Sequence, residues 1–540
     1  MKARSRAREG RLPIWPRMFR VGRCPPELLG TVACAGALAV TIGLTVLSSG
    51  GFDASSQAVF VALAGATLLL TGWFKSRATL LAAQSRFALT LGTLAALCVA
   101  SMTWTVGEPG AALRSGLTVA GYGAVFIAAS ALTQGLGPRP LVVAIAVIAA
   151  VEAILGLRGV ALHATPDAEL IAGTWRPGGT FEYPPAIAML QVGAIPILSR
   201  CLERESRVAV LAAGVATLSG ATIGLAASRL AVVLGATLLA ILILRPRVGW
   251  TSRLAAMATA TLIVTGAAAG VSLLDESPAQ GARAAGLMAL AELVAVAVLF
   301  GVAWLLARRT LLLRPPRRAA PIVCVTVVLL AATGWSATRL QGATSSTSRP
   351  DSSARSLPSA DLLHGRGPEW SAAVQTWLDR PLFGAGSGAY YRGSLPHQGL
   401  SPTLYAHNLP LELAAELGAG GLLLAVALYI AAAGTIATGR PSSATMLLAP
   451  MVVIFLVSNL VDWTWHLAGL TAVWAAAAGG LHAIGVRDHG LRQQSHSGRG
   501  ASLGPLVPVG PQPFGSRPSS ERTVIPTARP PHSSDCASSG

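Results

Sequence analysis

One histidine of the sequence stands in a context suited to proton transfer. His407 directly precedes a predicted helix that carries Glu412 and Glu416, and Asn408 lies beside it. A neutral imidazole can take a proton from an attacking hydroxyl, and a nearby carboxylate can orient the ring or balance its charge. We therefore predict His407 as a general base, with Glu412, Glu416 and Asn408 in support. The alternatives are a surface histidine without a role and two first-turn acids that only complement the helix dipole.

Two arginines have the chemistry to bind phosphate. Arg176 lies in a Gly/Pro-rich loop that enters an apolar stretch, and Arg229 lies at the start of another apolar stretch. A guanidinium group suits bidentate recognition of phosphate. The alternative for each arginine is snorkelling or pairing with a nearby carboxylate. Asp462 and His466, in the run NLVDWTWHLAG, are supporting polar groups that we expect on the same face.

Membrane-spanning helices are the elements that must position these residues. Of the 540 residues, 52% are hydrophobic and only 12% are charged, and the mean hydropathy is +0.58. This composition does not describe a water-soluble surface and predicts a polytopic membrane protein. The net charge of +18 comes from 41 Lys and Arg residues, so their distribution between the loops decides what the charge means.

We predict an all-α fold with about 14 (12–14) transmembrane helices, because each span needs roughly 20 apolar residues. The apolar stretches are centred near residues 38, 66, 95, 124, 149, 191, 216, 236, 264, 295, 329, 424, 452 and 475. With both termini in the cytoplasm, most of the 41 Lys and Arg residues fall on the inner side, as the positive-inside rule requires. Orientation in the membrane therefore explains the basic excess, and no nucleic-acid partner is expected.

Five regions follow from this pattern. They are a basic cytoplasmic N-terminal arm (1–26), transmembrane helices 1–11 (27–337), a large extracytoplasmic loop (338–410), transmembrane helices 12–14 (411–486) and a disordered cytoplasmic tail (487–540). The first apolar stretch is too long for a cleaved signal peptide, so we interpret it as an uncleaved helix. The six cysteines show neither a disulfide framework nor a metal-ligand spacing, so no metal site is predicted.

The second part of the large loop has the pattern of an ordered segment. Across Gly367–Phe383 apolar residues recur at helical spacing, which predicts a short helix on or above the membrane. Gly384 and Gly386 follow as a turn where backbone can pass close to a ligand. Arg366 and Arg380 belong to the same segment and are weaker candidates for phosphate binding. Because long ordered loops on a rigid scaffold often carry function, we expect the site on the outer face.

Four motifs resemble the bacterial O-antigen ligase and O-antigen polymerase family, in the order found in that family. HNLPLELAAELGAGG, residues 407–421, resembles its signature of His, then Asn, Ser or Gln, nine residues, Gly, two residues and a small residue. GGTFEYPPAIA resembles its G-T-F-x-N-P-N loop, AASRLA its Ser-Arg helix start, and WLDRPLFGAGSGAYY its D/N-x-P-x-x-G-x-G segment. The chain departs from the pattern at Glu182, Pro184 and Pro185, which replace the usual residues after the phenylalanine.

The resemblance implies a C-type glycosyltransferase that works without metal or cofactor. Its donor would be a polyprenyl-diphosphate-linked oligosaccharide or polysaccharide on the outer face of the cytoplasmic (inner) membrane, and its acceptor a hydroxyl of a glycan, lipid or protein. Arg176 and Arg229 match the arginines that hold the diphosphate, and His407 matches the histidine that acts on the acceptor hydroxyl. Ligase and polymerase share these motifs, so the sugar and the acceptor stay open within cell-surface polysaccharide biosynthesis.

A lipid-linked glycan flippase or another polytopic transporter is the alternative function. Such a protein also needs many spans and phosphate-binding residues, and Glu152 and Glu292 fall inside predicted spans, where an ionisable group is functional or paired by default. Transporters place coupling residues near the midplane of related halves. Here the polar residues gather on one side and no matching halves are found, which favours the transferase over the transporter and over a non-catalytic envelope scaffold.

Overall fold

The computed structural model describes residues 26–171, 173–204, 207–245, 249–275, 283–313, 366–399, 402–437 and 442–500. The described residues up to Gly490 belong to one compact unit, which holds the site described below, and those from Leu491 onward belong to a second. The predicted N-terminal arm, apart from its last residue, the first part of the large loop and the span centred near residue 329 lie outside the described residues.

The predicted all-helical membrane fold is confirmed. Within the described part of the chain, eleven helices are long and apolar enough to cross a membrane, and two shorter apolar helices accompany them. The eleven spans belong to α1 (Pro26–Leu47), α2 (Ala54–Phe74), α4 (Arg86–Ala100), α5 (Pro109–Leu136), α6 (Arg139–Leu162), α7 (Pro184–Leu202), α8 (Arg207–Ala226), α10 (Trp250–Gly270), α11 (Arg283–Leu313), α15 (Leu409–Ala437) and α17 (Ala468–Gly500). The two shorter helices are α9 (Arg229–Leu244) and α16 (Ser443–Ser458).

Shorter elements connect or cover the spans. The amphipathic helix expected within Gly367–Phe383 is present as α13 (Gly367–Asp379), and α14 (Tyr390–Ser394) follows it. The remaining helical elements are α3 (Ser76–Ala83), the 3₁₀ turns η1 (Ser49–Gly51), η2 (Ser101–Thr103), η3 (Gly179–Phe181), η5 (Leu395–His397) and η6 (Thr464–His466), and the π-helical turn η4 (Val271–Asp275).

Two local features differ from the sequence-based expectation. A hairpin of β1 (Ala168–Ile171) and β2 (Thr174–Pro177) stands before η3, and Gly173, with a φ of 82°, lets the chain reverse between its strands. The tail was expected to be disordered from residue 487, but α17 continues as a helix to Gly500.

Small residues allow the spans to pack closely. A Cβ atom on Gly220 of α8 would lie 2.1 Å from the backbone oxygen of Ile263 in α10, and one on Gly266 of α10 would lie 2.0 Å from that of Thr217. Helices in lipid associate through such close backbone approach, because the hydrophobic effect does not drive them together there. Gly220 and Gly266 are therefore packing residues.

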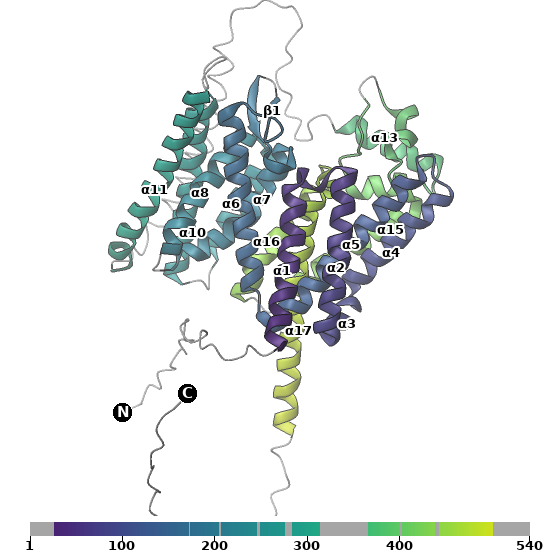
Figure 1. Ribbon diagram of the computed structural model, residues 1–540, viewed down its shortest axis with the longest axis horizontal. Helices are drawn as coiled ribbons and strands as arrows, with labels where there is room; N and C mark the ends of the chain where they lie inside the picture. Colours follow the sequence, from purple (N-terminus) through teal and green to yellow (C-terminus); the bar gives the residue numbers. More distant parts are fainter. Residues whose placement is uncertain are drawn as a thin grey trace, which may run out of the picture. The chain divides into compact units, whose positions relative to one another are not determined.

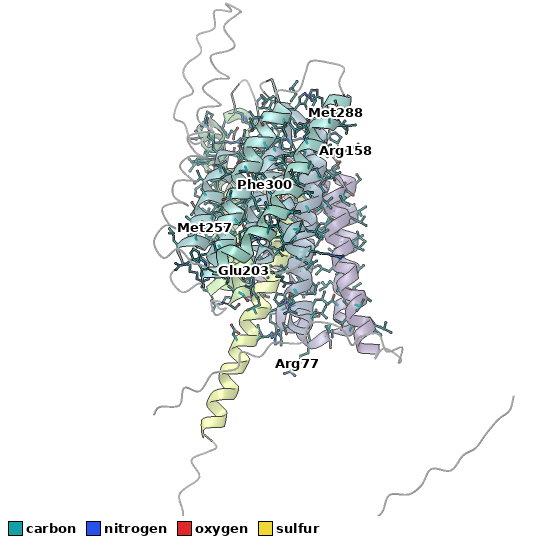
Figure 2. All side chains as sticks on the ribbon, turned by 90° about the vertical axis from the view of Figure 1, so that its left-hand side faces the viewer. Arg77, Arg158, Glu203, Met257, Met288 and Phe300 are labelled. Atoms are coloured by element: carbon teal, nitrogen blue, oxygen red, sulfur yellow. The ribbon has the colours of Figure 1, made fainter. Side chains whose placement is uncertain are left out.

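The two ends of the bundle carry different elements. Figure 1 shows α13 and the β1–β2 hairpin at the same end of the helix bundle. Arg158, which pairs with Asp167 at 3.0 Å beside this hairpin, lies toward that end, while Arg77 and Glu203 lie toward the other end (Figure 2). Since α7, α8 and α9 follow one another through short connections, the starts of α7 and α9 share the end that bears the hairpin and η3.

Candidate functional site

His407 is held in a defined orientation just before α15. Its backbone is left-handed, with a φ of 54°, and its side chain is 12% exposed. The ring atom Nδ1 lies 2.8 Å from Oε2 of Glu369 and 3.1 Å from the backbone oxygen of Tyr405. Both neighbours are acceptors, so Nδ1 carries a proton, and in the neutral form of the ring Nε2 keeps its lone pair. Nothing among the described residues hydrogen-bonds to Nε2, which is therefore open to a substrate hydroxyl.

Glu369, which the sequence analysis did not single out, is the carboxylate that orients His407. It lies in the first turn of α13, where Nη1 of Arg366 approaches its Oε2 to 3.2 Å. Burial alone would raise the pKa of Glu369, but the hydrogen bond and charge of His407 and the charge of Arg366 outweigh burial and lower the pKa below its ordinary value. The carboxylate therefore stays ionised. The available signal was the Arg-x-x-Glu spacing at the start of an amphipathic helix, which favours an i, i+3 pair.

Glu412 and Glu416, expected as partners of His407, bind other groups. Glu412 accepts the backbone N–H of Ala406 at 3.0 Å and pairs with Nε2 of His466. Glu416 accepts the backbone N–H of Tyr390 at 3.1 Å. Both side chains are buried within the start of α15, because the helix points them into the bundle. These bonds hold the segments around His407 in place. The partners of both glutamates are groups other than the imidazole, so the expectation that they contact it is wrong.

His466 lies beside this glutamate pair in η6. Burial alone would lower the pKa of His466, but the charge and hydrogen bond of Glu412 and the charge of Glu416 outweigh burial and raise the pKa above its ordinary value. The ring stacks on Tyr405 with centroids 4.1 Å apart. His466, Glu412 and Glu416 also line a partly open cavity of about 50 Å³, which is large enough to hold water.

Asp462 connects the loop before α7 to the same site. The hydroxyl of Tyr183 donates to its Oδ1 at 2.7 Å, and the backbone N–H of Trp463 donates to the same oxygen at 2.8 Å. Burial raises the pKa of Asp462 above its ordinary value, although these two bonds and the charges of His407 and Arg366 act against the rise. The loop that departs from the family pattern therefore reaches the His407 site through Tyr183.

Glycines of the large loop allow its backbone to pass close to the backbone of α15. Gly386 donates its N–H to the backbone oxygen of Glu416 at 2.7 Å, and a Cβ atom on Gly384 would lie 2.3 Å from the carbonyl carbon of the same residue. Gly418, with φ 65° and ψ −151°, interrupts α15 where this segment docks. We expected Gly384 and Gly386 near a ligand, but the backbone they approach is that of α15.

Asn408 is a structural neighbour of the histidine. Its side-chain oxygen accepts the backbone N–H of Leu411 at 3.0 Å, and its amide donates to the backbone oxygen of Leu460 at 2.8 Å. It thus caps α15 and ties the start of this helix to the segment after α16. This arrangement holds the turn that contains His407 in place.

The four predicted arginines lie at three elements: Arg366 and Arg380 flank α13, Arg176 is in β2 and Arg229 begins α9. Arg366, at the start of α13, belongs to the His407 network through Glu369. Arg176 stands opposite Glu169 in the hairpin register, and Arg229 is the exposed first residue of α9. Arg380 is exposed just after α13. Arg176 and Arg229 thus belong to the same end of the bundle as the loop of Tyr183.

The fold and the site together define a polytopic membrane protein whose loop presents an oriented imidazole at one end of a helix bundle. Residues 277–426 match the family model described as O-antigen ligase, and these residues include Glu369, His407 and Gly418. This match over part of the chain supports the family resemblance. No match is found among curated proteins. Arg176, Arg229, Asp462 and His466 lie outside the matched residues.

Proposed function

We propose that the protein is a glycosyltransferase of the ligase or polymerase type in cell-surface polysaccharide biosynthesis. It transfers a glycan from a polyprenyl diphosphate to a hydroxyl of a glycan, lipid or protein, at the outer face of the cytoplasmic membrane. The observation that carries this proposal is the geometry of His407. One ring nitrogen is fixed by a carboxylate and a backbone carbonyl, and the other is open, as a general base requires.

The reaction balances with the groups of this site. Nε2 of His407 takes the proton of the acceptor hydroxyl while the oxygen of that hydroxyl forms a bond to the anomeric carbon of the donor. The bond between the anomeric carbon and the diphosphate oxygen breaks, and the diphosphate leaves on its lipid. The imidazolium that forms lies against the ionised Glu369, so its charge is stabilised where it arises.

The leaving diphosphate needs positive charge close to where its own charge develops. Arg366 pairs with Glu369, so we assign it to orienting the carboxylate rather than to holding phosphate. Arg229 is exposed at the first turn of α9, where the helix N-terminus adds partial positive charge. We assign the diphosphate to Arg229 and Arg176, in agreement with the family pattern. Guanidinium groups that are already in place stabilise the leaving charge without a metal ion.

The test compares wild type with His407→Ala in the host and in purified form. In cells, His407→Ala should accumulate the lipid-linked glycan and lose surface polysaccharide, and in the purified reaction it should lose at least about a hundredfold in kcat. Accumulated full-length glycan indicates a ligase, and accumulated single repeat units indicate a polymerase. A chelator should leave the purified reaction unchanged. Undiminished transfer by His407→Ala would refute the proposed base, and donor trapped on the inner face would indicate a flippase instead.

A further inference from the structure

Glu152 is a fully buried carboxyl group that the proposed reaction does not use. It lies in the middle of α6, and its Oε2 accepts the backbone N–H of Thr180 in η3 at 2.9 Å. Its Oε1 lies 2.6 Å from the hydroxyl oxygen of Thr180. A Cβ atom on Gly179 would lie 2.3 Å from Oε2, so only glycine fits there. The loop before α7 is thus wrapped around this carboxyl group.

Counting protons at Thr180 defines the state of the carboxyl group. The hydroxyl oxygen of Thr180 lies 2.5 Å from the backbone oxygen of Val46 as well as 2.6 Å from Oε1 of Glu152. A hydroxyl has one proton, and a backbone carbonyl has none to give. The proton of Thr180 therefore goes to Val46, because two oxygens cannot approach to 2.5 Å without one between them. The contact with Glu152 then requires a second proton, which the carboxyl group must supply.

We propose that Glu152 is held as the neutral acid and is a positioning residue for the loop that carries Arg176 and Tyr183. This loop connects Glu152 to the His407 site. Thr180 is bound to Glu152, and three residues later the hydroxyl of Tyr183 donates to Oδ1 of Asp462 at 2.7 Å. On the opposite side, the backbone oxygen of Asp167 accepts the N–H groups of residues 178 and 179 at 2.9 and 2.8 Å. The inference rests on the proposed function, since the loop presents residues to the diphosphate.

The substitution Glu152→Gln distinguishes a neutral glutamic acid that positions the loop from a glutamate that carries protons during transport. In Glu152→Gln the amide oxygen can accept the Thr180 N–H, and the amide N–H₂ can donate to the Thr180 hydroxyl, so each bond of the neutral acid is kept. A glutamate that gains and loses a proton during transport cannot be replaced in this way. The glutamine variant therefore separates the positioning role from the transporter interpretation of this residue.

The experiment measures transfer by the purified full chain in lipid nanodiscs with a polyprenyl-diphosphate glycan. Glu152→Gln and Thr180→Ser should keep most of the wild-type kcat/KM and the wild-type pH profile. Glu152→Leu and Thr180→Val should each lose roughly tenfold, mainly through a raised KM for the donor, because buried donors and acceptors lose their partners and the loop shifts. The double variant Glu152→Leu/Thr180→Val should be little worse than either single variant, since both remove the contact between the Glu152 carboxyl group and the Thr180 hydroxyl.

A matched control distinguishes positioning from general loss of packing. Gln191 is buried in α7, where it binds the backbone oxygen of Ala149 and the hydroxyl of Ser219 at 2.9 and 2.7 Å. Gln191→Leu should lower the melting temperature without raising the KM for the donor. A glutamine variant as impaired as Glu152→Leu, or additive losses in the double variant, would overturn the inference. Full activity of His407→Ala in the same assay would refute the proposed function separately.

Discussion

Nδ1 of His407 and Oε2 of Glu369 lie 2.8 Å apart, although the two residues belong to the start of α15 and to the loop helix α13. The same carboxylate is bound by Arg366, so three side chains form a chain from the surface of α13 to the imidazole. Such a chain fixes the tautomer of the histidine, in the way that a buried carboxylate does in hydrolases with a catalytic triad. The activity of the protein should therefore depend on α13 as much as on α15.

Glu369→Gln should lower kcat by roughly a hundredfold or more, because the neutral amide no longer stabilises the imidazolium or selects the tautomer. The KM for the donor should change little. Glu108→Gln is the matched control: Glu108 also pairs with an arginine, Arg392, but is 74% exposed, and exposed pairs contribute little. Equal activity of the two variants would show that Glu369 does not act on His407.

His466 should make stability depend on pH in a defined direction. Its pKa is raised in the folded protein by Glu412 and Glu416, so the protonated ring stabilises the fold. This stabilisation is fully present below the unfolded value of about 6.5 and is lost as pH rises through the higher folded value. The melting temperature of the wild type should therefore exceed that of His466→Gln most at pH values below about 6.5, and the difference should shrink above that pH.

A second histidine serves as the control for this measurement. His397 pairs with Asp379, which is 57% exposed, at 2.6 Å on the surface of the loop. Because Asp379 is well solvated, whereas Glu412 is buried, His397→Gln should change the melting temperature less than His466→Gln does. A difference between wild type and His466→Gln that grows with rising pH would contradict the charge assigned to His466.

Gly418→Ala should destabilise the protein by on the order of 3 kcal/mol, because φ 65° with ψ −151° is a region open almost only to glycine. The added methyl group would also lie 2.3 Å from the backbone of Leu382. Melting temperature and yield from membranes measure the effect. Gly434→Ala, later in the same helix, adds its methyl group to open space and should be neutral or stabilising by up to about 1 kcal/mol. Equal yields and melting temperatures would contradict the docking of the loop on α15.

The sequence predicts what depends on local pattern and misses what depends on tertiary contact. Hydrophobic length places the spans, and helical spacing places α13, since both are properties of contiguous residues. Proximity in the sequence favours Glu412 or Glu416 as the partner of His407. The left-handed backbone at His407 and the capped start of α15 instead leave Glu412 to His466, while Glu369 approaches from a separate helix. A pairing between distant segments has no signature in either segment alone.

The polar residues near the last two spans illustrate the same limit. Asp462 and His466 were expected on one face, and both do lie in the segment between α16 and α17. Their partners, Tyr183 and Glu412, come from two other elements. The sequence therefore located the groups but could not say which of them supports which part of the site.

Arg229 and Arg380 allow a test in which the KM for the donor changes while the melting temperature does not. Arg229 is exposed, so Arg229→Gln should leave the melting temperature unchanged while the KM for the polyprenyl-diphosphate donor rises roughly tenfold, the loss expected for one charged hydrogen bond to phosphate. Arg380 is also exposed, at the end of α13, and was a weaker candidate for the same role. Arg380→Gln should leave both the melting temperature and the KM unchanged. Arg380 lies at the end of α13 opposite to the Arg366–Glu369 pair, so the length of the helix separates them. A raised KM for Arg380→Gln with a normal KM for Arg229→Gln would contradict this assignment and place the diphosphate at the large loop.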